Sequence, residues 1–218
     1  MTGLVVAMDG PSGSGKSSAS RGVARALGLR YLDTGAMYRA ITWWMLQQGV
    51  DLTDPGAIAA RALDPVLTLG TDPDLAVVAV DGVDAVAPIR TAEVTAAVSA
   101  VSAVPEVRHR LVAEQREIIG SGGIVVEGRD IGTVVAPGAA VKIYLTASAD
   151  ARALRRTAEL TGTTVAAQRA AMARRDTLDS TRKADPLAKA ADAVELDTTA
   201  LNLEEVIAEI LRVIKEKA

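Results

Sequence analysis

The sequence predicts an α/β protein in which a parallel sheet carries helices on both faces. Short apolar runs alternate with longer segments of helical periodicity along most of the 218 residues, and this alternation is typical of a parallel sheet covered on both sides. Residues 64–88 depart from the pattern, because β-branched runs there alternate with turn residues. That region predicts a small antiparallel sheet inserted into the domain.

Each core strand is predicted from a short apolar run, and each helix from its period and its ends. Gly28 and Gly49 follow the first two helical segments, where glycine commonly ends a helix. Pro105 stands at the first turn of a later helix, where proline is favoured. The predicted core strands are residues 3–8, 30–32, 123–126, 141–145 and 193–196, and the insert strands are 66–69 and 75–80. The predicted helices are residues 16–27, 34–48, 89–101, 105–119, 149–160, 164–175 and 203–215.

Composition excludes several classes of protein and site. With 49% hydrophobic and 23% charged residues the chain is globular, and with no cysteine it has no disulfide, thiolate metal site or cysteine nucleophile. A net charge of −3 argues against nucleic acid as a partner. The chain lacks an apolar run near 18 residues and a basic N-terminal region with a cleavage site, so we expect a cytoplasmic protein without membrane segment or signal peptide.

One segment predicts a phosphate-binding loop. Residues 10–17 fit G-x-x-x-x-G-K-[ST] between a predicted strand and a predicted helix. Its glycines let backbone N–H groups surround a phosphate, and the helix N-terminus adds roughly half a positive charge. Lys16 supplies a mobile cation and Ser17 a hydroxyl for Mg²⁺. The segment therefore predicts binding of a nucleoside triphosphate by Gly10, Pro11, Ser12, Gly13, Ser14, Gly15, Lys16, Ser17 and Ser18.

Two further segments stand at the carboxyl ends of predicted strands, where ligands bind in open α/β sheets. Residues 31–39 read Y-L-D-T-G-A-M-Y-R, and residues 125–135 read V-V-E-G-R-D-I-G-T-V-V. P-I-R-T lies between them at 88–91, and R-R-D-T-L-D-S-T-R follows at 174–182. Together with the phosphate loop and the insert, these motifs closely resemble the bacterial cytidylate kinases of the nucleoside monophosphate kinase family, from about residue 4 to the end of the chain.

The resemblance implies a P-loop NTPase-type fold with a five-stranded parallel core, an antiparallel insert in the monophosphate-binding region and a short lid. The core would comprise about residues 1–62, 105–150 and 190–218, the insert 63–104 and the lid 151–189. The implied activity is ATP-dependent phosphoryl transfer to CMP, and also to dCMP, giving the nucleoside diphosphate and ADP. The family further implies Mg²⁺ and a monomeric enzyme.

The resemblance also implies roles for residues outside the loop. Lys16, Arg129 and Arg182 would stabilise the transferred group, and Glu127 stands where an aspartate of the family serves Mg²⁺ through water, so its metal role is open. Arg39, Arg129 and Arg182 would hold the monophosphate, and Ser99, Arg108 and Asp130 would bind the base. Arg175 and Asp179 would lie near the ribose, and Thr34 and Tyr38 would also contact the substrate. The lid residues Arg155 and Arg156 would lie near the ATP phosphates.

The charges of the two substrates give these arginines a physical reason. Two like charges 4 Å apart repel by about 1 kcal/mol in water and about 4 kcal/mol at an effective dielectric of 20. Several such pairs meet when two nucleotides react, so arginines with bidentate forks should converge there. The attacking group is already an ionised phosphate, so the reaction needs no strong general base.

The base-reading residues favour CMP over UMP. Cytosine offers an N4 donor to the carboxylate of Asp130, and its N3 and O2 atoms accept from Arg108 or Ser99. Uracil reverses the pattern at positions 4 and 3 and would leave polar groups unpaired. Other small P-loop kinases, acting on UMP, shikimate or dephospho-coenzyme A, remain alternatives. A non-enzymatic nucleotide sensor also remains open, whereas a GTPase would need an N-K-x-D motif that the sequence lacks.

Overall fold

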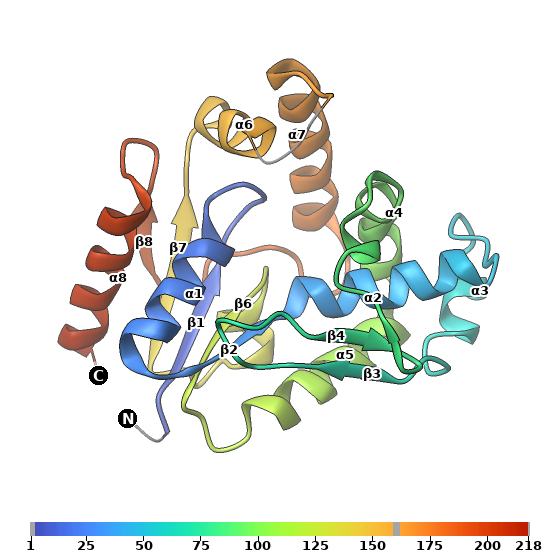
Figure 1. The fold of residues 1–218 in the computed structure, drawn as a ribbon, viewed down its shortest axis with the longest axis horizontal. Coiled ribbons are helices and arrows are strands. Elements are labelled where there is room, and N and C mark those ends of the chain that lie inside the picture. Colours follow the sequence, from blue (N-terminus) through green and yellow to red (C-terminus); the bar gives the residue numbers. More distant parts are fainter. Residues whose placement is uncertain (1–2, 159–161, 218) are drawn as a thin grey trace.

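A parallel five-stranded sheet lies between two layers of helices in the computed structural model, which describes residues 3–158 and 162–217 (Figure 1). The strand order is β2-β6-β1-β7-β8, and every neighbouring pair is parallel. This arrangement confirms the predicted fold class, and all five predicted core strands are present. Their bounds are β1 Val5–Asp9, β2 Arg30–Asp33, β6 Ile124–Glu127, β7 Val141–Thr146 and β8 Val194–Asp197.

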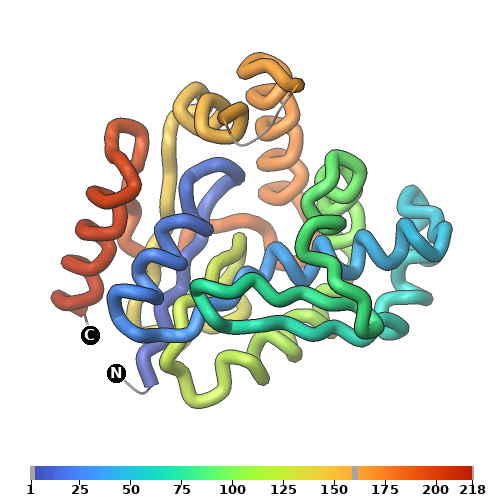
Figure 2. Tube along the Cα trace, in the orientation of Figure 1, coloured from blue at the N-terminus to red at the C-terminus, as the bar shows by residue number. Residues whose placement is uncertain are grey.

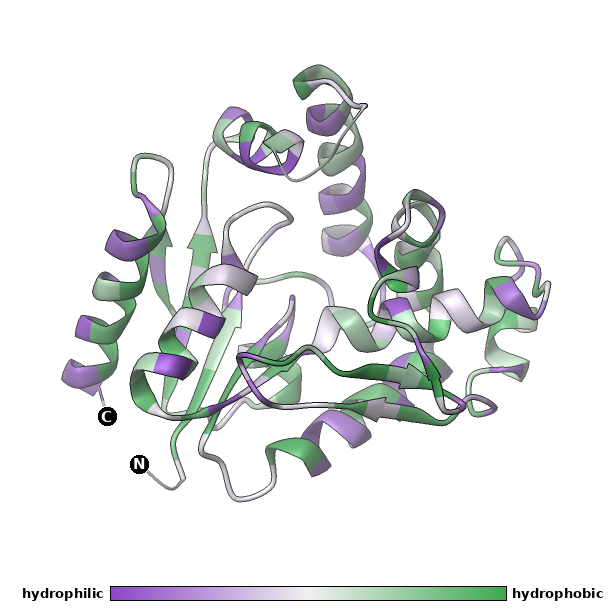
Figure 3. Cartoon of the chain, viewed as in Figure 1, coloured by the Kyte–Doolittle hydropathy of each residue, from purple (hydrophilic) through white to green (hydrophobic). Residues whose placement is uncertain are grey.

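Helices from distant parts of the chain cover the two faces of the sheet. On one face, α1 (Lys16–Leu27) and α8 (Leu203–Lys217) pack side by side against the central strands. On the other face, α2 (Thr34–Gln47), α4 (Ala92–Ser102) and α5 (Pro105–Ile119) form a second apolar cluster. Figure 3 shows the central strands as hydrophobic between these layers. Within the described ranges, no helix has both the length and the apolarity needed to cross a membrane.

The insert is a three-stranded antiparallel sheet of β3 (Leu67–Leu69), β4 (Val78–Val80) and β5 (Val83–Asp84). The predicted strand 75–80 is wrong in its first half, because residues 70–77 form a loop closed by a 2.9 Å bond from the Gly70 amide to the Val77 carbonyl. The Thr71 carbonyl in this loop accepts from the Tyr31 amide at 2.8 Å. The loop therefore reaches the edge of the main sheet beside α1, as Figure 2 shows.

Several other elements differ from the sequence-based prediction. The predicted helix 89–101 is two elements, a 3₁₀ helix (η1, Pro88–Arg90) and α4, because the Thr91 hydroxyl accepts from the Val94 amide and begins a new helix. Helix α3 (Pro55–Ala60), strand β5 and a π-helix (η2, Ile131–Val135) were not predicted. The region predicted as the lid, called the lid below, contains α6 (Ala149–Ala158) and α7 (Val165–Thr181), which continues past the predicted residue 175. The predicted end of α6, at 159–160, lies outside the described residues.

Candidate active site

The phosphate loop follows β1 and leads into α1, as predicted. Gly10 has a φ of +143°, and a Cβ built there would lie 2.1 Å from the carbonyl oxygen of Leu145 on β7, so only glycine fits. Gly15, with a φ of 87°, is the N-cap residue of helix α1, and no described side chain caps this helix. A helix start without a side-chain cap leaves first-turn N–H groups for an anion. The local geometry therefore suits a phosphate group.

Lys16 lies inside this loop. Its side chain is buried, and its Nζ atom donates to the Pro11 carbonyl at 2.6 Å and to the Ser14 hydroxyl at 3.3 Å. Burial, together with the nearby charge of Arg129, holds the pKa of Lys16 well below its usual range. An anion placed in the loop would oppose both effects, because it favours the charged ammonium group.

The loop opens into a cleft of about 370 Å³ between the core, the insert and the lid. Cationic side chains from five helices and one loop line it, whereas Asp33 and Glu127 are its acidic residues. These cations are Lys16 of α1, Arg39 of α2, Arg90 of η1, Arg129 after β6, Arg156 of α6 and Arg175 of α7. The excess of positive charge makes this cleft a site for polyanions.

Two of these arginines are partly buried and lie close enough to affect each other's charge. Burial lowers the pKa of Arg39 to about 9, and the charge of Arg175 adds to the effect. Burial likewise lowers the pKa of Arg175 to about 10, with a further contribution from Arg129. Arg39 donates to the Thr95 hydroxyl at 2.8 Å and to the Ile89 carbonyl at 3.3 Å. An anion bound between these two guanidinium groups would be stabilised, because it relieves the repulsion between them.

A second group of predicted residues lies behind the cleft, where the side chains pair with one another. Arg108 is almost fully buried and forms ion pairs with Asp130 and, at 2.7 Å, with Asp185. Arg182 approaches the other oxygen of Asp130 at 3.4 Å and donates to the Asp185 carbonyl at 2.8 Å. The Arg108 guanidinium also lies 5.6 Å from the centre of the Tyr38 ring. These residues form one buried polar cluster, and it does not line the described cleft.

Asp179 connects this cluster to the cleft. Its carboxylate accepts from the Ser99 hydroxyl at 3.3 Å and from Nε of Arg129 at 3.0 Å. Helix α7 supplies Asp179, α4 supplies Ser99, and the loop after β6 supplies Arg129, so three distant segments meet at this carboxylate. Asp179, predicted at the ribose, and Ser99, predicted at the base, are therefore neighbours in the structure.

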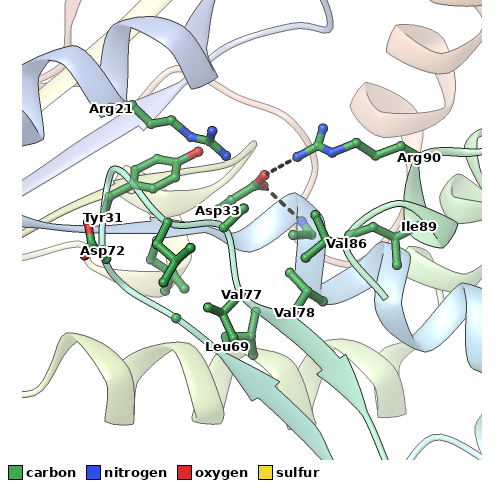
Figure 4. A pocket seen from close by; sticks show the side chains of 15 residues that line it. Arg21, Tyr31, Asp33, Leu69, Asp72, Val77, Val78, Val86, Ile89 and Arg90 are labelled. Atoms are coloured by element: carbon green, nitrogen blue, oxygen red, sulfur yellow. Dashed lines mark hydrogen bonds and ion pairs between the residues drawn. The ribbon is translucent and has the colours of Figure 1, made fainter. Parts of the chain in front are cut away.

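Glu127 ends β6 beside the phosphate loop and is fully buried from solvent by its neighbours. Its carboxylate accepts from the Tyr31 hydroxyl, and its backbone carbonyl accepts from the Thr34 hydroxyl at 2.7 Å. Burial raises the pKa of Glu127 to about 7, and the charge of Asp33 adds to the shift. Figure 4 shows Asp33 next to a small cavity, where the Arg90 guanidinium lies 3.7 Å from it and Arg21 approaches from the opposite side.

The comparisons with known proteins agree on one family. The family model for cytidylate kinases matches residues 6–216 of the chain. The chain belongs to the cytidylate kinase family. Among its relatives, the cytidylate kinase of Streptomyces avermitilis is 59% identical, with 98% of this chain and 94% of that protein covered. The cytidylate kinase of Nocardia farcinica is 60% identical, with 99% and 95% covered, and that of Lactiplantibacillus plantarum is 47% identical, with 98% and 96% covered.

Solved structures of low sequence identity share the fold of this cytidylate kinase family member. A gluconokinase from Sinorhizobium meliloti superposes with a TM-score of 0.53 at 16% identity, covering 99% of this chain and 93% of its own. TT1252 from Thermus thermophilus has a TM-score of 0.50 at 19% identity, covering both chains completely. These likenesses concern the fold alone, whereas the sequence comparisons establish the family and confirm the predicted resemblance.

The lid of the cytidylate kinase family member rests directly on the phosphate loop. Asp176 of α7 accepts from the Ser12 amide at 3.1 Å and pairs with Arg152 of α6, which also donates to the Ser12 carbonyl at 2.9 Å. A Cβ on Gly13 would lie 2.6 Å from the Met172 side chain, so glycine lets the lid approach this closely. Of the two predicted lid arginines, Arg156 lines the cleft, whereas Arg155 donates to Thr198 and Leu201.

Four charged residues of the site were missed from the sequence. Asp33 and Arg90 line the cleft, although both lie in motifs already singled out. Arg152 and Asp176 hold the lid on the phosphate loop, and Asp176 lies in the R-R-D motif. Asp33, Arg90 and Asp176 lie within motifs that the sequence analysis singled out, so their positions could have identified them. The direction of each side chain could not be deduced from spacing alone.

Proposed function

We propose that the chain transfers the terminal phosphoryl group of ATP to CMP, giving CDP and ADP, and that dCMP is a second acceptor. The observation that carries the proposal is the cleft itself. It extends from the phosphate loop to Arg129, which pairs at 3.0 Å with Asp179 beside the buried polar cluster, and its cations come from the core, the insert and the lid. Two anionic nucleotides can be brought together only where such charge offsets their repulsion.

On the donor side, the loop amides and Lys16 bind the ATP phosphates, and Arg156 approaches from the lid. Ser17 and Glu127 are the oxygen donors that line this end of the cleft, and they fit Mg²⁺, which prefers hard oxygen ligands. Among the described residues, no three histidine or acidic side chains are placed so that they could hold a metal ion by themselves, so nucleotide phosphates would complete the coordination. When bound, Mg²⁺ neutralises charge on the transferred group.

On the acceptor side, Arg39 and Arg129 hold the phosphate of CMP, and Arg182 completes the clamp from behind the cleft. Both Arg39 and Arg129 line the cleft opposite the phosphate loop. The acceptor oxygen is already ionised, so these residues align and stabilise the reacting groups and no base removes a proton. Catalysis is then electrostatic positioning of an in-line displacement.

The base is read by the buried cluster. The N4 amino group of cytosine donates to Asp130, while Arg108 and Ser99 donate to N3 or O2. In the described structure Arg108 and Asp130 bind each other, so the cytosine pairs with groups that are already oriented and desolvated. Arg175 and Asp179 take the ribose side. Uracil would place O4 against the Asp130 carboxylate, which makes UMP the poorer acceptor.

An assay of ADP release with Mg-ATP and a panel of acceptors tests the proposal. The panel contains CMP, dCMP, UMP, AMP, shikimate and dephospho-coenzyme A. We expect CMP and dCMP to give the highest kcat/KM, with CMP favoured over UMP by about 10²-fold or more. Equal rates with CMP and UMP would remove the base-reading argument, and turnover of shikimate or dephospho-coenzyme A in place of CMP would overturn the proposed function.

A further inference from the structure

The carboxylate of Asp9, next to the phosphate loop, is hydrogen-bonded to the loop that carries Arg129 and Asp130. Asp9 is the last residue of β1 and directly precedes Gly10 of the phosphate loop. It is 4% exposed, and its two oxygens accept from the amides of Ile131 and Gly132, each at 2.8 Å. Those amides follow Arg129 and Asp130 in the chain, so one side chain connects the donor loop to the acceptor loop.

The hydrogen bonds of the Asp9 side chain link β1 to the segment after β6 at the point where the main-chain hydrogen bonds between β1 and β6 end. The register of β1 with β6 ends at Met8 opposite Glu127, and the Gly128 amide still donates to the Met8 carbonyl at 3.0 Å. Beyond this bond the two backbones separate into the phosphate loop and the Arg129–Asp130 loop. The Asp9 carboxylate supplies the next two hydrogen bonds between them.

The two amides belong to the first turn of η2, the π-helix Ile131–Val135. First-turn amides have no acceptor within their own helix, and a carboxylate is the side chain that can accept from two of them at once. The arrangement holds the start of η2, and with it the backbone of Arg129 and Asp130. Burial raises the pKa of Asp9 to about 6, and the charge of Asp130 adds to the shift. Ionised Asp9 therefore lowers the stability of the folded state.

We infer that Asp9 is a positioning residue, which sets the separation between the phosphate loop and the loop that carries Arg129 and Asp130. Asp9 touches neither nucleotide in this scheme. It acts through the two backbones that do, and the inference rests on the proposed phosphoryl transfer from ATP to CMP.

Asp9→Asn tests the inference with little change in size. Asparagine keeps one acceptor oxygen, but its NH₂ group faces the second amide, so one of the two hydrogen bonds is lost. Because a displacement of about 1 Å between reacting groups can lower a rate by about 10²-fold, we expect kcat with CMP to fall by about 30-fold or more. Binding of a non-hydrolysable ATP analogue should stay within about threefold, since the phosphate loop itself is intact.

Asp81→Asn is the matched control. Asp81 also accepts from two N–H groups through its two oxygens, the Val66 amide at 2.8 Å and Nε1 of Trp44 at 2.7 Å, but it lies in the β4–β5 turn of the insert. A purely structural role predicts a lower melting temperature with kcat unchanged for both variants, with the smaller shift for Asp81→Asn because Asp81 is exposed. The positioning role predicts that only Asp9→Asn loses kcat when both are assayed well below their melting temperatures.

Gly132→Ala perturbs the same contact from the other side and decides the question if Asp9→Asn does not fold. Its Cβ would lie 3.3 Å from the Asp9 carboxylate and 3.1 Å from the Lys142 side chain. We expect kcat to fall by about 3–10-fold, with faster hydrogen exchange at the Ile131 and Gly132 segment. Suppose that the parent enzyme phosphorylates CMP and that folded Asp9→Asn keeps kcat within about twofold. The positioning inference is then wrong, and the proposed function stands. If Asp9→Asn does not fold, the same criterion applies to Gly132→Ala. A parent chain that does not phosphorylate CMP overturns the proposed function itself.

Discussion

The donor and acceptor sides of the cleft are built in different ways. The donor side is a continuous segment, Gly10–Ser18, whose backbone N–H groups and single lysine form the site. The acceptor side is assembled from side chains of α2, α4, α5, α7 and the loop after β6, and its charged groups pair with one another before any ligand is present. The first depends on local backbone geometry, and the second depends on the tertiary fold.

This difference separates affinity for phosphate from choice of acceptor. Backbone amides bind any phosphate in the same way, because they read charge and shape. Paired side chains such as Arg108 and Asp130 hold donors and acceptors in fixed places, so they distinguish one base from another. Substitutions on the donor side should therefore lower the rate with every acceptor, and substitutions on the acceptor side should change which acceptor is used.

The largest effect is expected from Lys16→Met. The variant removes the cation of the donor loop while keeping a chain of similar length, so stabilisation of the transferred group is lost. We expect kcat to fall by about 10³-fold, equally for CMP and UMP. Lys189→Met is the control, because Lys189 is an exposed lysine paired with Glu195 at 2.7 Å, and it should leave the rate unchanged. A Lys16→Met enzyme of parental kcat would contradict the assignment of the donor side.

Asp130→Asn should change acceptor choice. The amide of asparagine can donate to O4 of uracil, whereas the carboxylate can only accept, so the kcat/KM ratio of CMP to UMP should fall by about 10²-fold. Asp74→Asn serves as the control, since Asp74 is also a carboxylate paired with an arginine, Arg25, but it is exposed and lies outside the cleft and the cluster. It should leave the CMP to UMP ratio as it is. The acceptor-side argument fails if the ratio is the same in Asp130→Asn and the parent.

The smallest effect concerns stability at the junction of the two sides. Burial raises the pKa of Glu127 from its ordinary value of 4.5 to about 7. The folded chain therefore binds this proton more tightly than the unfolded chain, and the contribution to stability is lost as the pH rises through about 7. In metal-free buffer, Glu127→Gln should raise the melting temperature by about 5 °C at pH 8, because the buried charge is removed, and by much less at pH 4.5.

Glu195→Gln provides the comparison for this measurement, because Glu195 is an exposed carboxylate of the same type. Its melting temperature should follow that of the parent at both pH values. Thermal unfolding curves that show Glu127→Gln less stable than the parent at pH 8 would mean that the Glu127 charge stabilises the fold, contrary to this account.

The same contrast explains what the sequence could predict. The donor loop, its strand and its helix were all predicted, because their residues are contiguous and their glycines have a local purpose. Arg155 was expected at the ATP phosphates, and this stays a prediction. The structure has its guanidinium donating to Thr198 and lying 4.0 Å from where a Cβ on Gly15 of the phosphate loop would be.

The role of Asp9 could not be foreseen from the sequence, because its partners lie 122 and 123 residues away. The π-helix that offers those partners has no distinct pattern of its own. Helix α3 was missed although Asp54 and Pro55 form an N-terminal signal, because the helix has only six residues, P-G-A-I-A-A, and no polar residue that would give it a helical period. Elements that depend on tertiary contacts and lack a hydrophobic periodicity of their own could not be predicted from the sequence.

The close approach of β1 and β7 at Gly10 has a consequence for inhibition of the enzyme. A methyl group at this position would run into a main-chain carbonyl, which no change of rotamer can move aside. Every single-nucleotide change that replaces this glycine therefore damages the protein. Resistance to a compound that contacts this stretch of backbone could therefore not arise by replacing Gly10 itself.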